Sequence, residues 1–349
     1  MTDFTNRQPS ISVIDAIILA FNHMITVLFR PFNIVKWLKF GLVAFLAALG
    51  TNQGNSFNFN IPTGNGGGKG EFAQIEPFFN QAYQWVLANL TLVIIVGIAV
   101  ILLIAIIWII LLYFGSRFTF VFLDGVIKND IRIKQPYKEN KTLGWSYFLW
   151  RIIFTLTALL AILLIIGIPT TFLILAGVGK GFSLGIILGL VGAGLVFIGL
   201  AIILAIIGVF TDDFVVPIMY LLKIRILQSW KIFWSILRTN KLQFFLYILL
   251  KMGLSLASIL VMCLSMCVVC CVALAPAAIL VGLGVLAIKY PLVWIVVALV
   301  IIPLIVGLGI LTQTVLLPVT VFFRTYPLAF LEGFGEEFAC ITKAKSLSV

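Results

Sequence analysis

The sequence predicts an all-α integral membrane protein with about six transmembrane helices. Of its 349 residues, 62% are hydrophobic and 10% are charged, and the mean hydropathy is +1.22. Soluble domains contain about 45–50% apolar and about 25% charged residues. The apolar residues also form long uninterrupted runs, and the cations concentrate beside alternate runs. These observations exclude a soluble enzyme and a nucleic-acid-binding domain.

The apolar runs give the positions of the spans. A bilayer core about 30 Å thick requires about 20 apolar residues at a rise of 1.5 Å each. Runs of this kind predict spans at residues 34–50, 88–116, 152–178, 182–210, 242–271 and 292–323. Pro276 interrupts the uncharged stretch that follows the fifth span, so we expect a half-helix at 276–288 on the outer side. A seventh span is the alternative.

The positions of the cations predict the orientation. With six spans, all but three of the 23 Lys and Arg residues fall on one side of the membrane, and Lys69, Lys180 and Lys289 fall on the other. Lys and Arg are retained on the cytoplasmic side. We therefore expect a multi-pass protein of the inner or plasma membrane with cytoplasmic N- and C-termini and an even number of spans.

The cytoplasmic segments predict interfacial amphipathic helices. Apolar residues recur at helical spacing opposite polar ones in 11–30, in 224–238 and, more weakly, in 118–133. Such helices lie at the membrane surface with their basic face toward anionic headgroups. A fourth interfacial helix is predicted at 324–345. The predicted headgroup-facing residues are Arg30, Lys36, Arg225, Lys231, Arg238 and Lys241.

A threefold internal repeat within one domain, 1–349, is a further hypothesis. Asn33, Asn140 and Asn240 each precede a basic residue, aromatic residues and a span. This spacing suggests units of about 11–116, 117–211 and 212–323, each an interfacial helix followed by a transmembrane hairpin. Any even-span protein with basic inner loops can look periodic, so the alternative stays open.

Small and polar residues inside the spans have structural and functional interpretations. Gly177, Gly181, Gly185 and Gly189 recur every fourth residue, which favours close helix packing. Thr312, Gln313 and Thr314 form a polar cluster that either lines a pathway or bonds a neighbouring helix. Asp212 and Asp213, at the inner end of the fourth span, are expected to pair with lysines rather than to bind cations.

No catalytic, cofactor or metal site is predicted with any strength. Cys263, Cys267, Cys270 and Cys271 share a helix face and suit Cu(I) as soft ligands. One straight helix cannot close around an ion, so packing is the favoured interpretation and a copper or redox protein is the least favoured one. The carboxylates are few and scattered, and we expect no enzymatic activity.

Three strings carry a resemblance to known proteins. They are 28–33 (LFRPFN) with the following Trp37, 213–217 (DFVVP) with the following Trp230, and 323–335 (FRTYPLAFLEGFG). Together they resemble a group of uncharacterised bacterial multi-pass membrane proteins. That group is similar, more distantly, to the membrane domain found beside glycerophosphodiester phosphodiesterases. The resemblance implies a lipid-related membrane module without the catalytic barrel, and it carries over no active site.

Two functions follow as hypotheses. The first is a non-enzymatic scaffold or lipid-associated module that acts with a protein partner or as a homo-oligomer. It would contact membrane lipids, including anionic headgroups on the cytoplasmic side, and no nucleic acid. The second is a transporter or permease for a small apolar or amphipathic substrate, suggested by the repeat and by the Pro/Gly-interrupted spans. A continuous polar cavity that reaches Gln313 would favour transport.

Overall fold

The computed structural model describes residues 10–49, 84, 86–175, 184–289 and 293–346, and in these ranges every regular element is a helix. The elements are α1 (Val13–Phe29), α2 (Ile34–Ala48), α4 (Leu90–Lys128), α5 (Lys134–Glu139), α6 (Lys141–Leu175), α7 (Leu184–Phe210), the π-helical turn η1 (Thr211–Val215), α8 (Val216–Leu222), α9 (Ile226–Thr239), α10 (Lys241–Lys289), α11 (Val293–Val315), α12 (Leu317–Glu332), the 3₁₀ turn η2 (Glu336–Phe338) and α13 (Ile341–Ser346).

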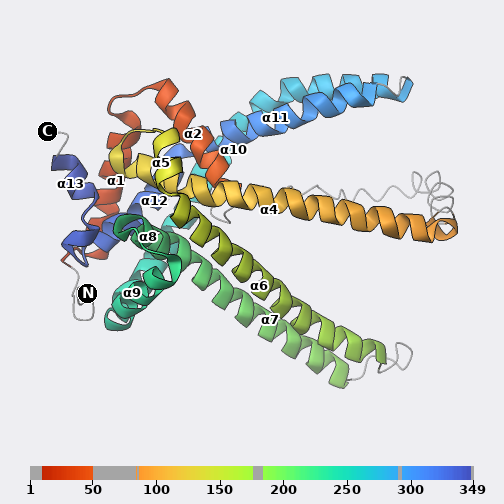
Figure 1. Ribbon diagram of the computed structural model, residues 1–349, viewed down its shortest axis with the longest axis horizontal. Coiled ribbons are helices and arrows are strands. Elements are labelled where there is room, and N and C mark those ends of the chain that lie inside the picture. The colour runs from red at the N-terminus through yellow and green to blue at the C-terminus, as the bar shows by residue number, and fades with distance from the viewer. Residues whose placement is uncertain (1–9, 50–83, 85, 176–183, 290–292, 347–349) are drawn as a thin grey trace.

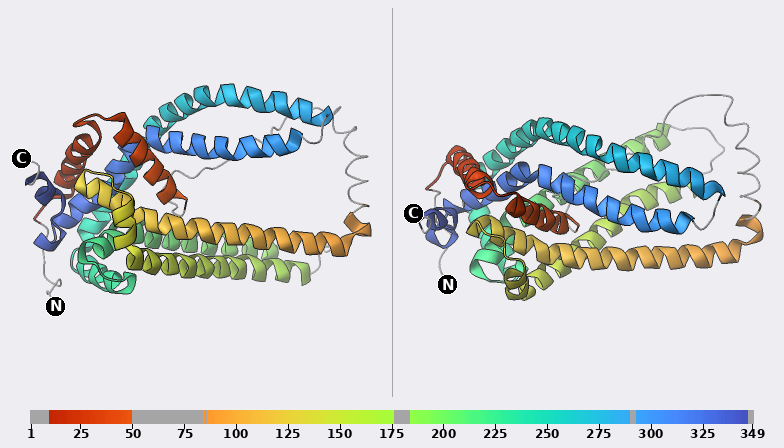
Figure 2. Two further views of the ribbon diagram at one scale, coloured as in Figure 1. Left: turned by 45° about the horizontal axis from the view of Figure 1, so that its top comes forward. Right: turned by 90° about the horizontal axis from the view of Figure 1, so that it is seen from above.

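The helices divide into a packed head and three arms (Figure 1). The head consists of α1, α5, α8, α9, α12, η2 and α13 together with the inner ends of α4, α6 and α10. The arms are α4, the pair α6 and α7, and the pair α10 and α11. They diverge from the head in Figure 1 and extend from the same side of it in Figure 2. The short helix α2 lies between α4 and α11 where those arms leave the head.

Four helical stretches in the described part of the chain are long and apolar enough to cross a membrane. They lie in α4, α6, the continuous stretch from α7 through η1 to α8, and α10, which agrees with the predicted spans at 88–116, 152–178, 182–210 and 242–271. The predicted spans at 34–50 and 292–323 fall on helix pairs bent by 119° (α1 and α2) and by 60° (α11 and α12). The number of crossing elements is therefore four, or up to six if each bent pair counts as one.

The predicted half-helix at 276–288 is not a separate element. Helix α10 continues through Pro276 to Lys289, so neither a half-helix nor a seventh span begins there. Proline removes one backbone hydrogen bond, which a long apolar helix tolerates when neighbouring groups or a local adjustment satisfy the freed carbonyl.

Two predicted interfacial segments are instead part of the protein interior. Helix α4 runs on to Lys128, and nearly all of its side chains from Gly115 to Ile127 are buried in the head. In the predicted 324–345 helix, Leu328, Leu331, Phe334 and Phe338 are at most 1% exposed. The same helical apolar pattern suits a membrane surface or a protein core, and here these residues face neighbouring helices.

Helix α1 keeps an apolar stripe on the outside. Ser12 caps its N-terminus by accepting a hydrogen bond from the Asp15 amide at 3.1 Å. Ala16 and Ala20 are fully buried and allow close packing against α12, whereas Ile14, Ile18 and Phe21 are exposed. The predicted apolar face of this segment is therefore at least half exposed at these three residues.

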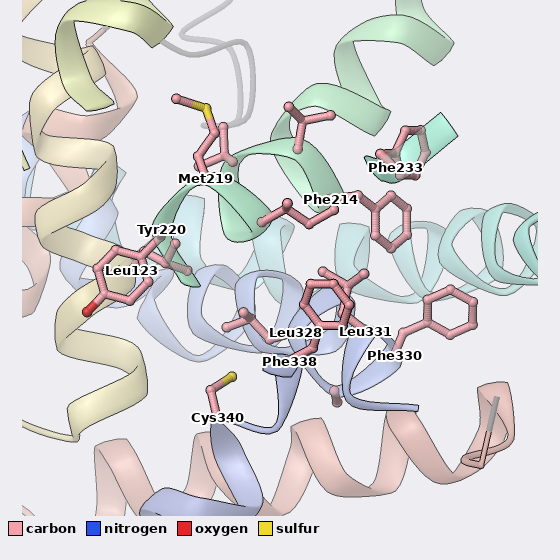
Figure 3. Packing of buried hydrophobic residues seen from close by; sticks show 14 of the residues in the cluster. Leu123, Phe214, Met219, Tyr220, Phe233, Leu328, Phe330, Leu331, Phe338 and Cys340 are labelled. Carbon is pink, nitrogen blue, oxygen red and sulfur yellow. The ribbon is translucent and has the colours of Figure 1, made fainter. Parts of the chain in front are cut away.

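An aromatic core holds the head together (Figure 3). The Phe214 ring stacks on Phe233 with centroids 5.4 Å apart, and Phe244 and Phe330 meet edge to face at 5.2 Å. Each such pair contributes about 0.5–1.5 kcal/mol beyond the burial of apolar area. These rings come from η1, α9, α10 and α12, and the same core includes Ala16, Phe120 and Tyr147 from α1, α4 and α6, so it joins both halves of the chain.

Candidate functional site: a polar junction between the arms

Two consecutive carboxylates lie where the arms join the head, and they connect the end of α7 to α6, α10 and α12. The π-helical turn η1 continues α7, and Asp212 and Asp213 lie on it. The Asp212 carboxylate accepts a hydrogen bond from the Tyr147 hydroxyl on α6, and its main-chain carbonyl accepts one from Arg324 Nη1 at 2.9 Å. π-Helical turns insert one extra residue into a helix and occur frequently at functional sites.

Asp213 faces the opposite arm. Its carboxylate accepts a hydrogen bond from the Tyr247 hydroxyl at 2.9 Å and forms an ion pair with Lys251 Nζ, both on α10. The pairing of these aspartates with lysine, expected from the sequence, is confirmed for Asp213. We call the group Tyr147, Asp212, Asp213, Tyr247, Lys251 and Arg324 the junction cluster.

A cavity of about 780 Å³, here called the junction cavity, opens beside this cluster. At its inner end lie Tyr147, Arg151, Asp212 and Lys251. Its remaining walls are largely apolar and aromatic. They come from the end of α2, from α4, α6 and α7, and from the start of η1: Ala48, Leu49, Trp108, Leu112, Trp150, Phe154, Thr155, Ala158, Leu204, Ala205, Gly208, Val209 and Thr211. Ligand pockets typically measure about 300–1,000 Å³, so the volume suits a small amphipathic molecule.

A second cavity of about 280 Å³, here called the Gln313 cavity, lies on the other side of Lys251. Asp213, Gln313 and Arg324 line it, together with Ser255 and Ser258. Lys251 and Ala48 line both cavities, so the Asp213–Lys251 pair lies where the two approach each other. Gln313 is thus brought beside charged residues that are distant in the sequence.

The other two members of the predicted polar pathway have local partners. The Thr312 hydroxyl donates to the Leu308 carbonyl at 2.8 Å, and the Thr314 hydroxyl donates to the Ile310 carbonyl at 2.7 Å. A Cβ built on Gly41 would lie 2.0 Å from Thr314 Oγ1, so α2 and α11 pack closely at this position. A pathway role stays a prediction, for which Gln313 is the best placed of the three residues.

The predicted glycine stripe is only partly described. Gly177 and Gly181 lie outside the described residues, Gly185 lies on α7, and a Cβ built on Gly189 meets nothing within 4 Å. Close packing through a small residue is instead seen at Gly41 against Thr314 and at Gly309, where a Cβ would lie 2.4 Å from the Phe45 ring. The sequence prediction of tight packing at 177–189 remains untested.

The predicted headgroup-facing cations are mostly on the surface. Arg30, Arg225, Lys231, Arg238 and Lys241 are exposed. Lys36 instead donates hydrogen bonds to the Val27 carbonyl and to Asn129 Oδ1, each at 2.7 Å, and so ties α1 and α2 to the end of α4. Binding of lipid headgroups by the five exposed residues stays a prediction.

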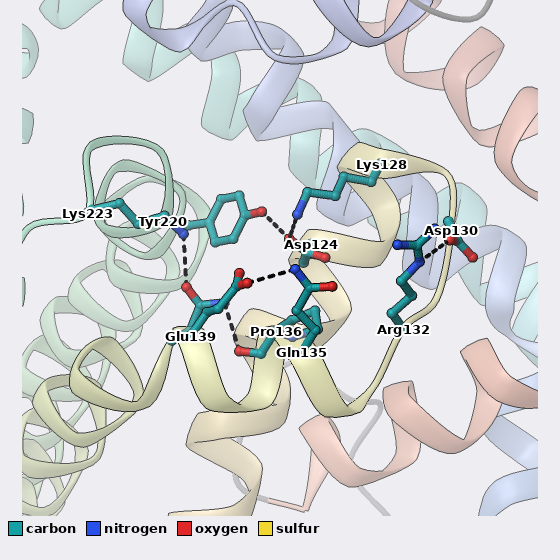
Figure 4. Close-up of polar contacts among 10 residues, drawn as sticks. Asp124, Lys128, Asp130, Arg132, Gln135, Pro136, Glu139, Tyr220 and Lys223 are labelled. Carbon is teal, nitrogen blue, oxygen red and sulfur yellow. Dashed lines mark hydrogen bonds and ion pairs between the residues drawn. The ribbon is translucent and has the colours of Figure 1, made fainter.

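A second polar group lies in the head, away from both cavities (Figure 4). Asp124 on α4 accepts a hydrogen bond from the Tyr220 hydroxyl and forms an ion pair with Lys128 at 2.7 Å. Lys223 donates to Asn140 Oδ1 at 2.9 Å and joins α8 to the start of α6. These contacts connect α4, α6 and α8 within the head.

The cysteines form no site that the structure describes. Cys263, Cys267, Cys270 and Cys271 are unbonded and exposed on α10, and Cys340 is buried in the head. Within the described ranges, no group of three or more His, Cys, Asp or Glu residues is arranged to hold a metal ion. Metal binding by the four α10 cysteines stays a weak hypothesis.

Sequence reasoning missed most of the junction cluster. Tyr147, Tyr247 and Arg324 lie on three different helices, and no sequence spacing connects them. Arg151 and Lys251, however, are charged residues near or inside predicted spans, and such residues are functional candidates by default. That signal was available for both, and it would have pointed to the end of the arms nearest the head.

The fold and the site define a helical protein whose long helices are apolar enough to cross a membrane and meet at a polar junction. Residues 11–341 match the model of a family described as "Family of unknown function (DUF7544)", and the chain belongs to that family. The chain matches no curated protein and no solved structure.

Proposed function

We propose that this protein is a non-enzymatic, lipid-associated module of the cytoplasmic membrane that holds an amphipathic lipid in the junction cavity. The observation that carries the proposal is the cavity itself, which has a charged inner end and largely apolar walls and lies between diverging arms. The arms expose apolar side chains along most of their length, as a lipid solvent requires. The head would lie on the cytoplasmic side, in agreement with the distribution of cations.

Several further features support a membrane module without catalysis. The two carboxylates of the junction cluster are bonded to tyrosines and a lysine. These bonds hold the helices in place, and the cluster contains no nucleophile paired with a base. The exposed stripe Ile14, Ile18 and Phe21 on α1 suits contact with a bilayer surface. The threefold repeat and the relation to the membrane domain of glycerophosphodiester phosphodiesterases stay hypotheses within this proposal, as does a partner protein or second copy.

Co-purified lipid provides the test. The protein is isolated in a mild detergent and its bound lipids and proteins are identified by mass spectrometry. We expect a lipid class enriched over its share in the membrane, and we expect that Ala205→Phe, which fills the cavity, reduces this enrichment at least fivefold. Ala278→Phe on the exposed part of α10 is the matched control. Equal retention by both variants, or no enrichment in the wild type, contradicts the proposal.

A transporter is the second candidate, and the Gln313 cavity is the observation that favours it. This cavity and the junction cavity approach each other at Lys251 and Ala48, so one rearrangement at the Asp213–Lys251 pair could join them. Single-cysteine variants at Ser258 and Thr155 test for it. Labelling of both sites by a membrane-impermeant maleimide from the side remote from the head supports transport, and protection of both argues for the lipid module.

A further inference from the structure

Arg151 is a charged residue of the junction cavity, and within the described ranges its guanidinium forms no close ion pair. It lies on α6 about 10 residues after the helix begins, and it is half-buried. Its guanidinium lies over the Tyr147 ring at 5.5 Å and 3.4 Å from Ser116 Oγ. None of the ion pairs found among the described residues includes Arg151.

The other charges of the cavity lining are already occupied. Lys251 forms an ion pair with Asp213. The Asp212 carboxylate accepts the Tyr147 hydroxyl and interacts electrostatically, without a close ion pair, with Arg151 and Arg324. A cation at membrane depth that lacks a close ion pair is costly, and such residues pair or face a cavity or pathway. Arg151 meets the second condition, since its side chain lines the cavity.

The polarity of the cavity changes along α6. From Tyr147 to Ala158 the helix rises roughly 16 Å at 1.5 Å per residue. Tyr147 and Arg151 line its inner part, whereas Trp108, Phe154 and Ala158 line its outer part. An occupant with an anionic head and an apolar tail directed along the arms matches both parts. Arginine in particular matches phosphate, because its planar fork can donate two parallel hydrogen bonds.

We propose that Arg151 binds the phosphate of a membrane phospholipid whose acyl chain follows the apolar wall of the junction cavity. This inference rests on the proposed lipid-associated function and names the chemistry of the bound group. Free inorganic phosphate could bind Arg151 in the same way as the phosphate of a lipid. Only a lipid, however, has an acyl chain that would also contact Trp108 and Phe154.

Native mass spectrometry of the full-length protein with two probes tests the assignment. Dioleoyl phosphatidylglycerol supplies the phosphate, and dioleoylglycerol supplies the same chains without it. We expect the wild type to prefer the phospholipid about tenfold or more, as a charge-assisted bidentate contact implies. Arg151→Gln should remove this preference. Arg132→Gln, on the exposed segment between α4 and α5 and outside both cavities, should retain it within about twofold.

Three results would overturn the assignment. They are equal phospholipid binding by the wild type and Arg151→Gln, no preference of the wild type for the phospholipid over dioleoylglycerol, and displacement of the phospholipid by millimolar inorganic phosphate. Arg151→Lys, which keeps the charge and loses the fork, provides the second variant if Arg151→Gln does not fold, and we expect binding weakened several-fold. If the wild type and Arg151→Gln retain the lipid equally, only this inference fails. If the wild type retains no lipid at all, the proposed function fails with it.

Discussion

The head and the arms contain equally apolar helices but bury their side chains to very different extents. In the head, Phe214 and Leu328 are completely enclosed, whereas Leu195 and Leu260 on the arms are 65% and 72% exposed. A lipid tail is as apolar as a leucine side chain, so an arm in a bilayer gains little by packing against another arm. The head must therefore supply most of the packing that holds the three arms in one arrangement.

The head and the arms should differ most in how much a Phe→Ala substitution lowers the free energy of unfolding. Phe214→Ala in the head leaves a cavity in the aromatic core and should lower the free energy of unfolding by about 3–5 kcal/mol. Phe197→Ala on α7, where the ring is 37% exposed, should change it by less than about 1 kcal/mol. Thermal and denaturant unfolding of both variants in the same detergent provides the measurement. Equal destabilisation would mean that the arms pack as tightly as the head.

The second-largest loss of stability is expected for a substitution in the junction cluster. Asp213→Asn leaves the Lys251 ammonium largely buried without its carboxylate, which typically costs about 3 kcal/mol or more. Asp130→Asn is the control, because Asp130 pairs with Arg132 in an exposed ion pair that should contribute at most about 1 kcal/mol. Unfolding in the same detergent compares the two variants. If both cost the same, the Asp213–Lys251 pair does not join the arms.

A smaller effect is expected where α2 packs against α11. Gly41→Val places a side chain where a Cβ alone would approach Thr314 Oγ1 to 2.0 Å, and overpacking of this kind costs about 1–3 kcal/mol. Gly253→Val on α10 is the matched control, because its Cβ would meet nothing within 4 Å. A neutral Gly41→Val in thermal unfolding would show that α2 is not held against the arm.

The smallest effect is a pH dependence at Cys340. Burial raises the pKa of this thiol above its ordinary value, so the folded protein retains a proton that the unfolded chain releases above about pH 8.5. Its contribution to stability is therefore present below that pH and is lost as the pH rises further. We expect slow maleimide labelling of Cys340 in a variant in which the four α10 cysteines are serine, and fast labelling after unfolding. Rapid labelling of the folded variant at pH 8 would contradict the burial of this thiol in the head.

The sequence predicted the long helices well and the bent ones poorly. The runs in α4, α6, α7 and α10 are apolar on every side, so length and composition were sufficient to find them. The bend between α11 and α12 and the continuity of α10 through Pro276 depend on which neighbours satisfy the backbone and cover the side chains. A proline alone does not reveal this, because its effect depends on the packing around it.

By itself the sequence determined that the chain forms helices long and apolar enough to span a membrane, because the transfer of apolar side chains from water depends on composition and run length. It also predicted lysine partners for Asp212 and Asp213, which holds for Asp213 with Lys251, whereas Asp212 bonds to Tyr147 and Arg324. Only the tertiary structure decided that the apolar residues after Arg324 face protein, and that Tyr147, Arg151, Asp212 and Lys251 meet at one cavity. An amphipathic pattern indicates that one face of a helix is shielded from water, but it does not indicate whether lipid or protein covers that face. Contacts between helices about 100 residues apart cannot be predicted from the spacing of residues within either helix.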